Sequence, residues 1–179
     1  MPEIPPLEPP DSMHLEAAQG WLDLDSHLEA NEELEKIAPG NRVHPDVLQV
    51  RWRIYARAAK WAASLDVATA LTERVPERRF GWIHRAISLH RLGRTREALD
   101  LISSVKERFE PNSTIPFYQA CFASRLGRQA ETWQFIEEAI QTAEDPETRR
   151  RLRKRVMHDP DLAPMRVQIL KLLERLDDE

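Results

Sequence analysis

The stretch Leu92-Gly93-Arg94, followed by Glu97-Ala98-Leu99, decides the fold. Its pattern is a turn residue followed five positions later by a small residue, and this pattern returns at intervals of 34 residues. The turn positions are Asp25, Ala59, Gly93 and Gly127, and the small residues are Ala30, Ser64, Ala98 and Thr132. Self-similarity at a fixed period of this size indicates stacked supersecondary units, each of which buries its apolar face against the next.

Apolar columns keep the same register on both sides of the turn. The columns after the small residue are Leu34, Ala68, Ile102 and Ile136, then Ile37, Leu71, Val105 and Ala139. The columns before the turn are Ala18, Trp52, Ala86 and Ala120; Trp21, Tyr55, Leu89 and Ala123; and Leu24, Ala58, Leu92 and Leu126. Spacings of three and four place these residues on one face of a helix, so each unit is predicted to hold two amphipathic helices. Prolines that end the second helices are Pro39, Pro76, Pro111 and Pro146.

These residues resemble the tetratricopeptide-repeat (TPR) family. The third unit carries most of the motif, in Trp82, Ala86, Leu89, Gly93, Ala98, Ile102 and Pro111. The resemblance implies an all-α, right-handed TPR superhelix (an α-solenoid) with C-terminal capping helices. The predicted division is a proline-rich arm at 1–12, four units at about 13–43, 44–77, 78–112 and 113–146, and a cap at 147–179.

Both ends of the chain depart from the repeat. The arm is predicted to be extended and polyproline-like, and the sequence leaves open whether it docks or stays free. The cap is predicted as a helix over about 147–158, a break at Pro160, and a last helix. The apolar stripe of that last helix, which should cover the open end of the fourth unit, is Leu162, Met165, Ile169, Leu172 and Leu176.

Composition and motifs narrow the function classes. The formal net charge of −4 gives no bulk attraction for nucleic acid, and the single cysteine, Cys121, cannot form an internal disulfide. No apolar run is long enough to span a membrane, and the N-terminus lacks the pattern of a signal peptide, which predicts a cytoplasmic protein. No catalytic motif or metal-ligand spacing is present, so we expect neither an enzyme nor a metal or cofactor.

Charge is partitioned between the two helices of each unit. The stretch 47–60 carries Arg51, Arg53, Arg57 and Lys60 without an acid, whereas acids crowd the second helices of the first and fourth units. In TPR proteins the first helices line a concave groove, so the resemblance implies a basic groove. The predicted groove residues are Gln49, Arg53, Arg57, Phe80, His84, His90, Arg91, Phe117, Tyr118 and Arg125. The predicted partner is another protein or peptide, acidic with apolar anchors. The Lys and Asn set that clamps chaperone tails is absent.

Alternatives remain open from the sequence. The arginines could be solvated helix surface. The chain could instead self-associate as a homo-oligomer through Phe80, Phe117 and Tyr118. The basic run 149–155 could grip nucleic acid, although the pattern favours a cap helix that buries Leu152 and Val156 and leaves its charges in water.

Overall fold

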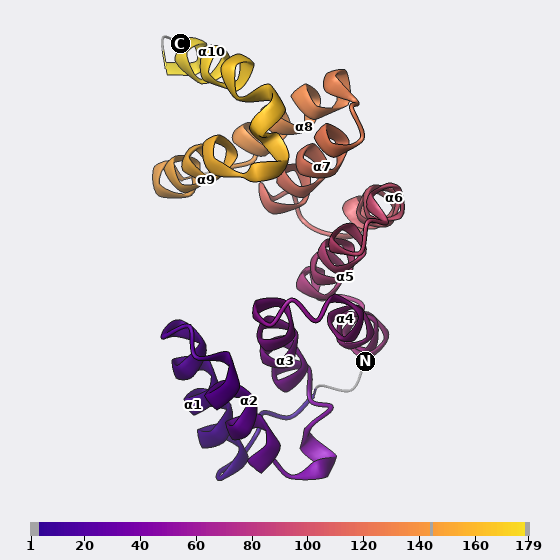
Figure 1. Cartoon of the computed structure of the whole chain (residues 1–179), viewed down its shortest axis with the longest axis vertical. Helices are drawn as coiled ribbons and strands as arrows, with labels where there is room; N and C mark the ends of the chain where they lie inside the picture. Colours follow the sequence, from indigo (N-terminus) through magenta and orange to yellow (C-terminus); the bar gives the residue numbers. More distant parts are fainter. Residues whose placement is uncertain (1–3, 144, 178–179) are drawn as a thin grey trace. The chain divides into compact units, whose positions relative to one another are not determined.

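The computed structural model describes residues 4–143 and 145–177, with side chains as far as Lys171 (Figure 1). Within these residues every regular element is a helix. The α-helices are α1 (Asp11–Asp23), α2 (His27–Lys36), α3 (Pro45–Arg57), α4 (Trp61–Arg74), α5 (Arg79–Arg91), α6 (Thr95–Val105), α7 (Thr114–Arg125), α8 (Gln129–Gln141), α9 (Pro146–His158) and α10 (Arg166–Asp177). Three 3₁₀ segments, η1 (Pro39–Asn41), η2 (Lys106–Arg108) and η3 (Pro160–Met165), connect them.

The chain forms two compact units, which are described separately below. The first unit ends at Ser88 and the second begins at Leu89, so the division falls within α5. The first unit therefore holds α1 to α4 and most of α5, and the second holds the last turn of α5 and everything after it.

The same turn joins the two helices of each pair. Its central residue has a left-handed backbone at Asp25 (φ 62°), Ala59 (φ 53°), Gly93 (φ 81°) and Gly127 (φ 72°), which are the positions that the 34-residue register predicts. The amide that follows each of them bonds back to a carbonyl five residues earlier, as from Arg94 N to Leu89 O at 2.9 Å. A left-handed residue after a helix is the usual way to satisfy its last carbonyls.

Burial confirms most of the predicted columns. The small residues Ala30, Ser64, Ala98 and Thr132 are each 0% exposed. One column is wrong: Leu24 is 71% exposed and Leu92 is 40% exposed. Leu24 is the C-terminal cap of α1, where the chain leaves the helix, so helical spacing no longer fixes the direction of its side chain.

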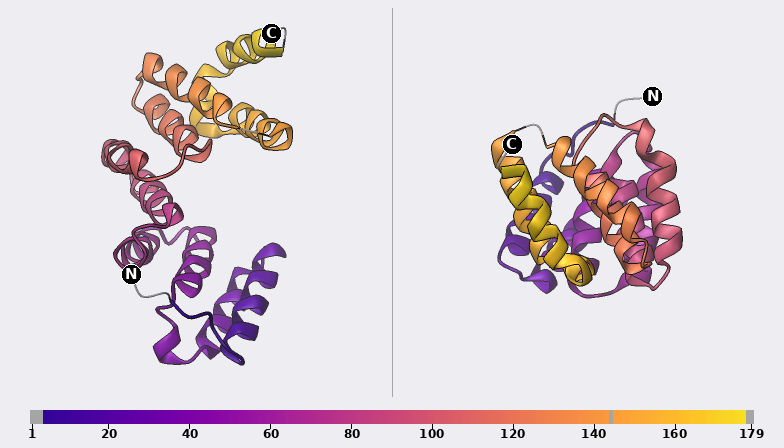
Figure 2. Two further views of the ribbon diagram at one scale, coloured as in Figure 1. Left: turned by 180° about the vertical axis from the view of Figure 1, so that it is seen from behind. Right: turned by 90° about the horizontal axis from the view of Figure 1, so that it is seen from above.

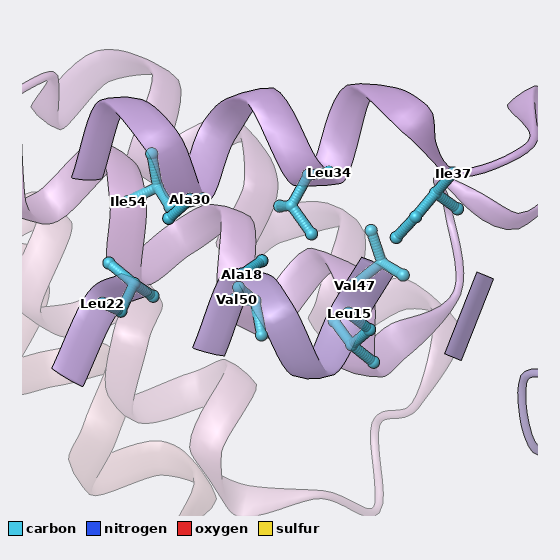
Figure 3. Packing of buried hydrophobic residues seen from close by; sticks show 9 residues of the cluster. All are labelled: Leu15, Ala18, Leu22, Ala30, Leu34, Ile37, Val47, Val50 and Ile54. Atoms are coloured by element: carbon cyan, nitrogen blue, oxygen red, sulfur yellow. The ribbon is translucent and has the colours of Figure 1, made fainter. Parts of the chain in front are cut away.

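One core cluster of the first unit lies between α1, α2 and α3, and a second, which includes Trp52 and Leu71, lies between α3 and α4. Leu34 and Ala30 of α2 lie opposite Leu15 and Ala18 of α1, and Val50 of α3 completes the contact (Figure 3). Small residues such as Ala18 and Ala30 let the helix axes approach closely while the larger side chains fill the space beside them.

The described part of the proline-rich arm docks on this core. Leu7 packs against the cluster, and His44 Nε2 lies 3.1 Å from the carbonyl oxygen of Pro5. The arm ends sooner than predicted, because α1 begins at Asp11. The buried carboxylate of Asp11 accepts hydrogen bonds from Ala38 N (3.0 Å) and Asn41 Nδ2 (2.7 Å), which ties the start of α1 to η1.

In the second unit, α7 and α8 pack as a pair (Figures 1 and 2), α9 contacts α8, and η3 lies on α7. The segment that was predicted as one last helix forms two elements: residues 160–165 are a 3₁₀ helix, and α10 starts at Arg166. Pro164 explains the division, because proline has no amide hydrogen and disfavours α geometry in the residue before it. Leu162, Met165 and Ile169 are buried as expected, whereas the side chains of Leu172 and Leu176 lie outside the described residues.

Candidate functional site

The predicted groove residues divide equally between the two units. The first unit contains Gln49, Arg53, Arg57, Phe80 and His84, and the second contains His90, Arg91, Phe117, Tyr118 and Arg125. Each set is therefore considered within its own unit, and the existence of one groove shared by all ten residues stays a prediction.

Two arginines of α3 reach carboxylates at the end of α1. Arg53 Nη2 donates to Asp23 Oδ1 at 3.3 Å, and Arg57 pairs with Asp25. Both pairs are open to water, since the side chains of Asp23 and Asp25 are 75% and 76% exposed. Carboxylates at a helix C-terminus oppose the helix dipole, and the last turn of α1 holds no basic residue, so the arginines offset this charge.

The exposed ion pairs leave these arginines available to other carboxylates. A solvated pair of this kind contributes about 0–1 kcal/mol, because water competes for both charges. An acidic ligand could therefore replace Asp23 or Asp25 at little cost in free energy. Gln49 lies half-buried on the same helix.

Phe80 and His84 belong largely to the packing of the first unit. The His84 ring stacks on Trp52, with 3.7 Å between centroids and 2° between planes, and Phe80 lies 5.9 Å away at a tilt. Trp52 Nε1 donates to Ser88 Oγ at 2.9 Å, which fixes the indole in place. Burial, and then the nearby charge of Arg53, lower the pKa of His84 from 6.5 to about 4, so the ring is neutral at physiological pH.

Three of the predicted residues in the second unit gather around one carboxylate, that of Asp161 in η3. His90 Nε2 lies 3.1 Å from Asp161 Oδ2, and Arg125 Nε lies 3.6 Å from Asp161 Oδ1. The hydrogen bond from His90, with the charges of His90, Arg125 and Arg91, holds the pKa of Asp161 below its usual value despite partial burial. The basic residues of this unit are therefore assembled to receive a carboxylate, which the chain itself supplies.

Two aromatic residues of α7, Phe117 and Tyr118, lie beneath Arg155 of α9. The guanidinium carbon of Arg155 is 4.1 Å from the ring centroid of Phe117 and 4.9 Å from that of Tyr118, and its Nη2 donates to the Tyr118 hydroxyl. Phe117 is 1% exposed. Burial raises the pKa of Tyr118, and the charge of Arg155 opposes that rise. These aromatics, predicted as anchors for a partner, are thus covered by the chain's own cap.

The basic run 149–155 lies on α9 as a cap helix. Leu152 and Val156 are 6% and 1% exposed, which confirms their predicted burial. Arg149 Nη2 donates to Ala143 O at 3.1 Å and Arg151 Nε to Glu147 at 2.9 Å, so several of these cations already have internal partners.

Sequence reasoning missed an exposed apolar surface on the first helix pair. Met13, Trp21, Leu24 and Leu28 are 63%, 39%, 71% and 68% exposed. Met13 lies opposite the buried face of α1, which a helical wheel through Leu15 and Leu22 could have shown, whereas Leu24 follows the helix. Asp161 was missed because the sequence gives no reason to pair it with His90, 71 positions earlier.

Three findings concern metal ligands, the cysteine thiol and membrane spans in the described residues. These residues contain no cluster of three or more His, Cys, Asp or Glu side chains suited to a metal ion. Burial raises the pKa of the Cys121 thiol well above its usual value, which disfavours the nucleophilic thiolate. Among these same residues, no helix has the length and apolar character needed to cross a membrane.

Comparisons with known proteins identify the fold. No family model and no curated protein matches the sequence. Among solved structures, the chain is similar to the TPR protein TTC0263 of Thermus thermophilus, with a TM-score of 0.72 and 15% identity over 89% of this chain and 85% of that one. A TPR protein of Parabacteroides merdae gives a TM-score of 0.65 at 14% identity, covering 83% of this chain and 58% of that one.

A mutant of MamA gives a TM-score of 0.58 at 17% identity over 74% of this chain and 77% of that one. Together with the recurring turn, these similarities show that the chain has a TPR-type repeat fold, as the sequence predicted.

Proposed function

We propose that this protein is a non-enzymatic interaction module that binds an acidic segment of another protein. The binding residues are the arginines of the first helices, with Arg53 and Arg57 as the accessible site in the first unit. The proposal includes the division into four units and a cap, and a cytoplasmic location, for which the lone cysteine is the supporting observation.

One observation carries the proposal: in both units, arginines that were predicted to line the groove form ion pairs with carboxylates of the same chain. Arg53 and Arg57 meet Asp23 and Asp25, and Arg125 meets Asp161. Exposed arginines paired in this way attract an acidic segment by long-range electrostatics, and carboxylates of that segment then replace the internal ones. Because the pairs are solvated, added salt should weaken binding as the Debye length falls to about 10 Å at 0.1 M.

The test uses affinity capture from the native cell with mass spectrometry, followed by a comparison of two charge-reversal variants. The site variant combines Arg53→Glu with Arg57→Glu. Its matched control combines Arg150→Glu with Lys154→Glu on the exposed side of α9. We expect the site variant to lose the captured partner and the control to keep it, with circular dichroism showing equal helicity. If the control loses the partner and the site variant keeps it, the basic run of α9 is the binding site instead.

A second candidate, self-association, is favoured by the exposed apolar surface of α1 and α2. Leu24 and Leu28 are 71% and 68% exposed. Exposed apolar side chains of this size favour burial against another protein. Phe80 and Phe117, which the sequence suggested for this role, are packed internally. Light scattering decides: a dimer that becomes monomeric in Leu24→Ser with Leu28→Ser supports self-association, and a monomeric wild type excludes it.

A further inference from the structure

The middle of helix α7 is buried on every side, unlike a helix that lines an open groove. The residues Gln119 to Ala123 are five consecutive buried residues. At 3.6 residues per turn, five in succession go round the whole helix. The helices α6 and α8 and the segment η3 pack against it, and Arg155 of α9 lies over the ring of Phe117. Part of what encloses α7 is therefore a short 3₁₀ segment from the end of the chain.

The polar part of the contact that η3 makes with α7 and the end of α5 is a site that holds the Asp161 carboxylate. Asp161 Oδ2 lies 3.1 Å from His90 Nε2, and the other ring nitrogen of His90 lies 3.0 Å from Thr95 Oγ1, which sets the orientation of the ring. Ser124 Oγ donates to the main-chain oxygen of Asp161 at 2.7 Å. The site reaches water, since the Arg125 side chain is 56% exposed.

The apolar half consists of two anchors on the same segment. Leu162, directly after Asp161, is 1% exposed and Met165 is 3% exposed, whereas Ala163 and Pro164 between them are exposed. The main-chain N–H of Asp161 donates locally, to Asp159 Oδ1 at 2.9 Å. The segment is thus held on α7 by the side chains of Asp161, Leu162 and Met165 and by one main-chain oxygen, as a short linear peptide would be.

We propose that η3 occupies the partner site of the second unit as an internal stand-in, and that a partner segment binds there by displacing it. This inference rests on the proposed function and specifies the partner. The partner segment carries a carboxylate, a large apolar residue directly after it, and a second one three positions later, as in Asp161, Leu162 and Met165.

The consequence is a site that is closed until a competitor arrives. A segment tethered to its own site acts at a high effective concentration, on the order of millimolar for short linkers. A partner must overcome this concentration, so the wild-type chain should bind a free segment much more weakly than a chain whose η3 has been disabled.

The experiment uses the full chain and a fluorescein-labelled peptide that copies residues 158–171. The release variant combines Asp161→Ala with Leu162→Ala, which removes the carboxylate and one anchor from η3. We expect the release variant to bind the peptide at least about tenfold more tightly than the wild type, as removal of a tethered competitor requires. Adding Arg125→Glu to the release variant should abolish binding, and a peptide with the same two alanines should not bind.

The matched control combines Val167→Ala with Lys171→Ala, two exposed positions of α10, and should bind the peptide as weakly as the wild type. Equal affinity of the release variant and the wild type overturns the inference. Loss of the cooperative melt in the release variant also overturns it, because η3 is then an indispensable part of the core. Either result leaves the capture test of Arg53 and Arg57 unaffected, so the two proposals fail separately.

Discussion

Replacing Gly93 by alanine tests the left-handed turn that recurs through the chain. Gly93 has φ +81°, and a Cβ built on it meets nothing within 4 Å, so the whole effect comes from the backbone. A left-handed conformation costs an L-residue roughly 1–2 kcal/mol. Alanine recovers about 0.4–1 kcal/mol by restricting the unfolded chain. The net expectation for Gly93→Ala is a loss of about 1 kcal/mol in the free energy of unfolding.

The chain supplies both a reciprocal change and a control. Ala59 occupies the corresponding turn at φ 53°, so Ala59→Gly should raise the free energy of unfolding by about 1 kcal/mol through the same two effects. Gly20 lies within α1, and an added Cβ there also meets nothing within 4 Å. Gly20→Ala should therefore stabilise by about 0.5–1 kcal/mol, because glycine is a poor helix former.

Urea denaturation followed by circular dichroism measures all three differences, provided that the slope m is unchanged. The decisive outcome is the sign. If Gly93→Ala and Gly20→Ala shift stability in the same direction, or if Ala59→Gly destabilises, the left-handed turn does not govern these positions.

Three further predictions concern burial and hydrogen bonding. Ala98→Leu should overpack the helix contact and cost about 1–3 kcal/mol, whereas Arg94→Ala at the exposed turn should change stability by at most about 0.5 kcal/mol; equal shifts in melting temperature would contradict the register. The pKa of His84 is about 4 in the folded chain, against 6.5 for a free histidine, so between these pH values the unfolded chain binds a proton that the folded chain does not. The free energy of unfolding should therefore fall as pH drops from 6.5 to 4, and His84→Gln should reduce this pH dependence. Asp11→Ala should lower the melting temperature more than Asp23→Ala, because Asp11 is buried and hydrogen-bonds to η1 whereas Asp23 makes one exposed ion pair; comparable losses would show that these hydrogen bonds add nothing.

The sequence predicted the helix pairs because their determinants are local. A left-handed residue between Leu89 and Ala98 fixes the turn, and small and apolar residues at helical spacings of three and four fix the packing face, without distant contacts. The same reasoning failed at Leu24, since a helical column ends where the helix ends. Pro164 was likewise a local signal, and it accounts for the 3₁₀ geometry of η3.

The candidate site was less predictable because a register fixes which face of a helix a residue lies on, and not what later covers that face. Phe117 and Tyr118 were correctly placed on α7, yet Arg155 of α9 lies over both rings. His90 and Arg125 both contact one carboxylate, and that carboxylate comes from η3. Each of these contacts depends on where the end of the chain folds back, which a repeat pattern does not encode.

The two proposed sites differ in the exposure of the carboxylates that occupy them, and salt should separate them. The carboxylates that occupy the first site, Asp23 and Asp25, are about three-quarters exposed, whereas Asp161 is 21% exposed and is followed by the buried Leu162. Ions screen exposed charges but barely weaken apolar burial. Raising salt from about 0.05 to 0.5 M should therefore weaken partner capture that depends on Arg53 and Arg57 far more than it weakens peptide binding to the Asp161→Ala, Leu162→Ala variant. Measured in the same buffers, parallel salt dependence of the two would mean that charge alone governs both sites and that Leu162 and Met165 are not anchors.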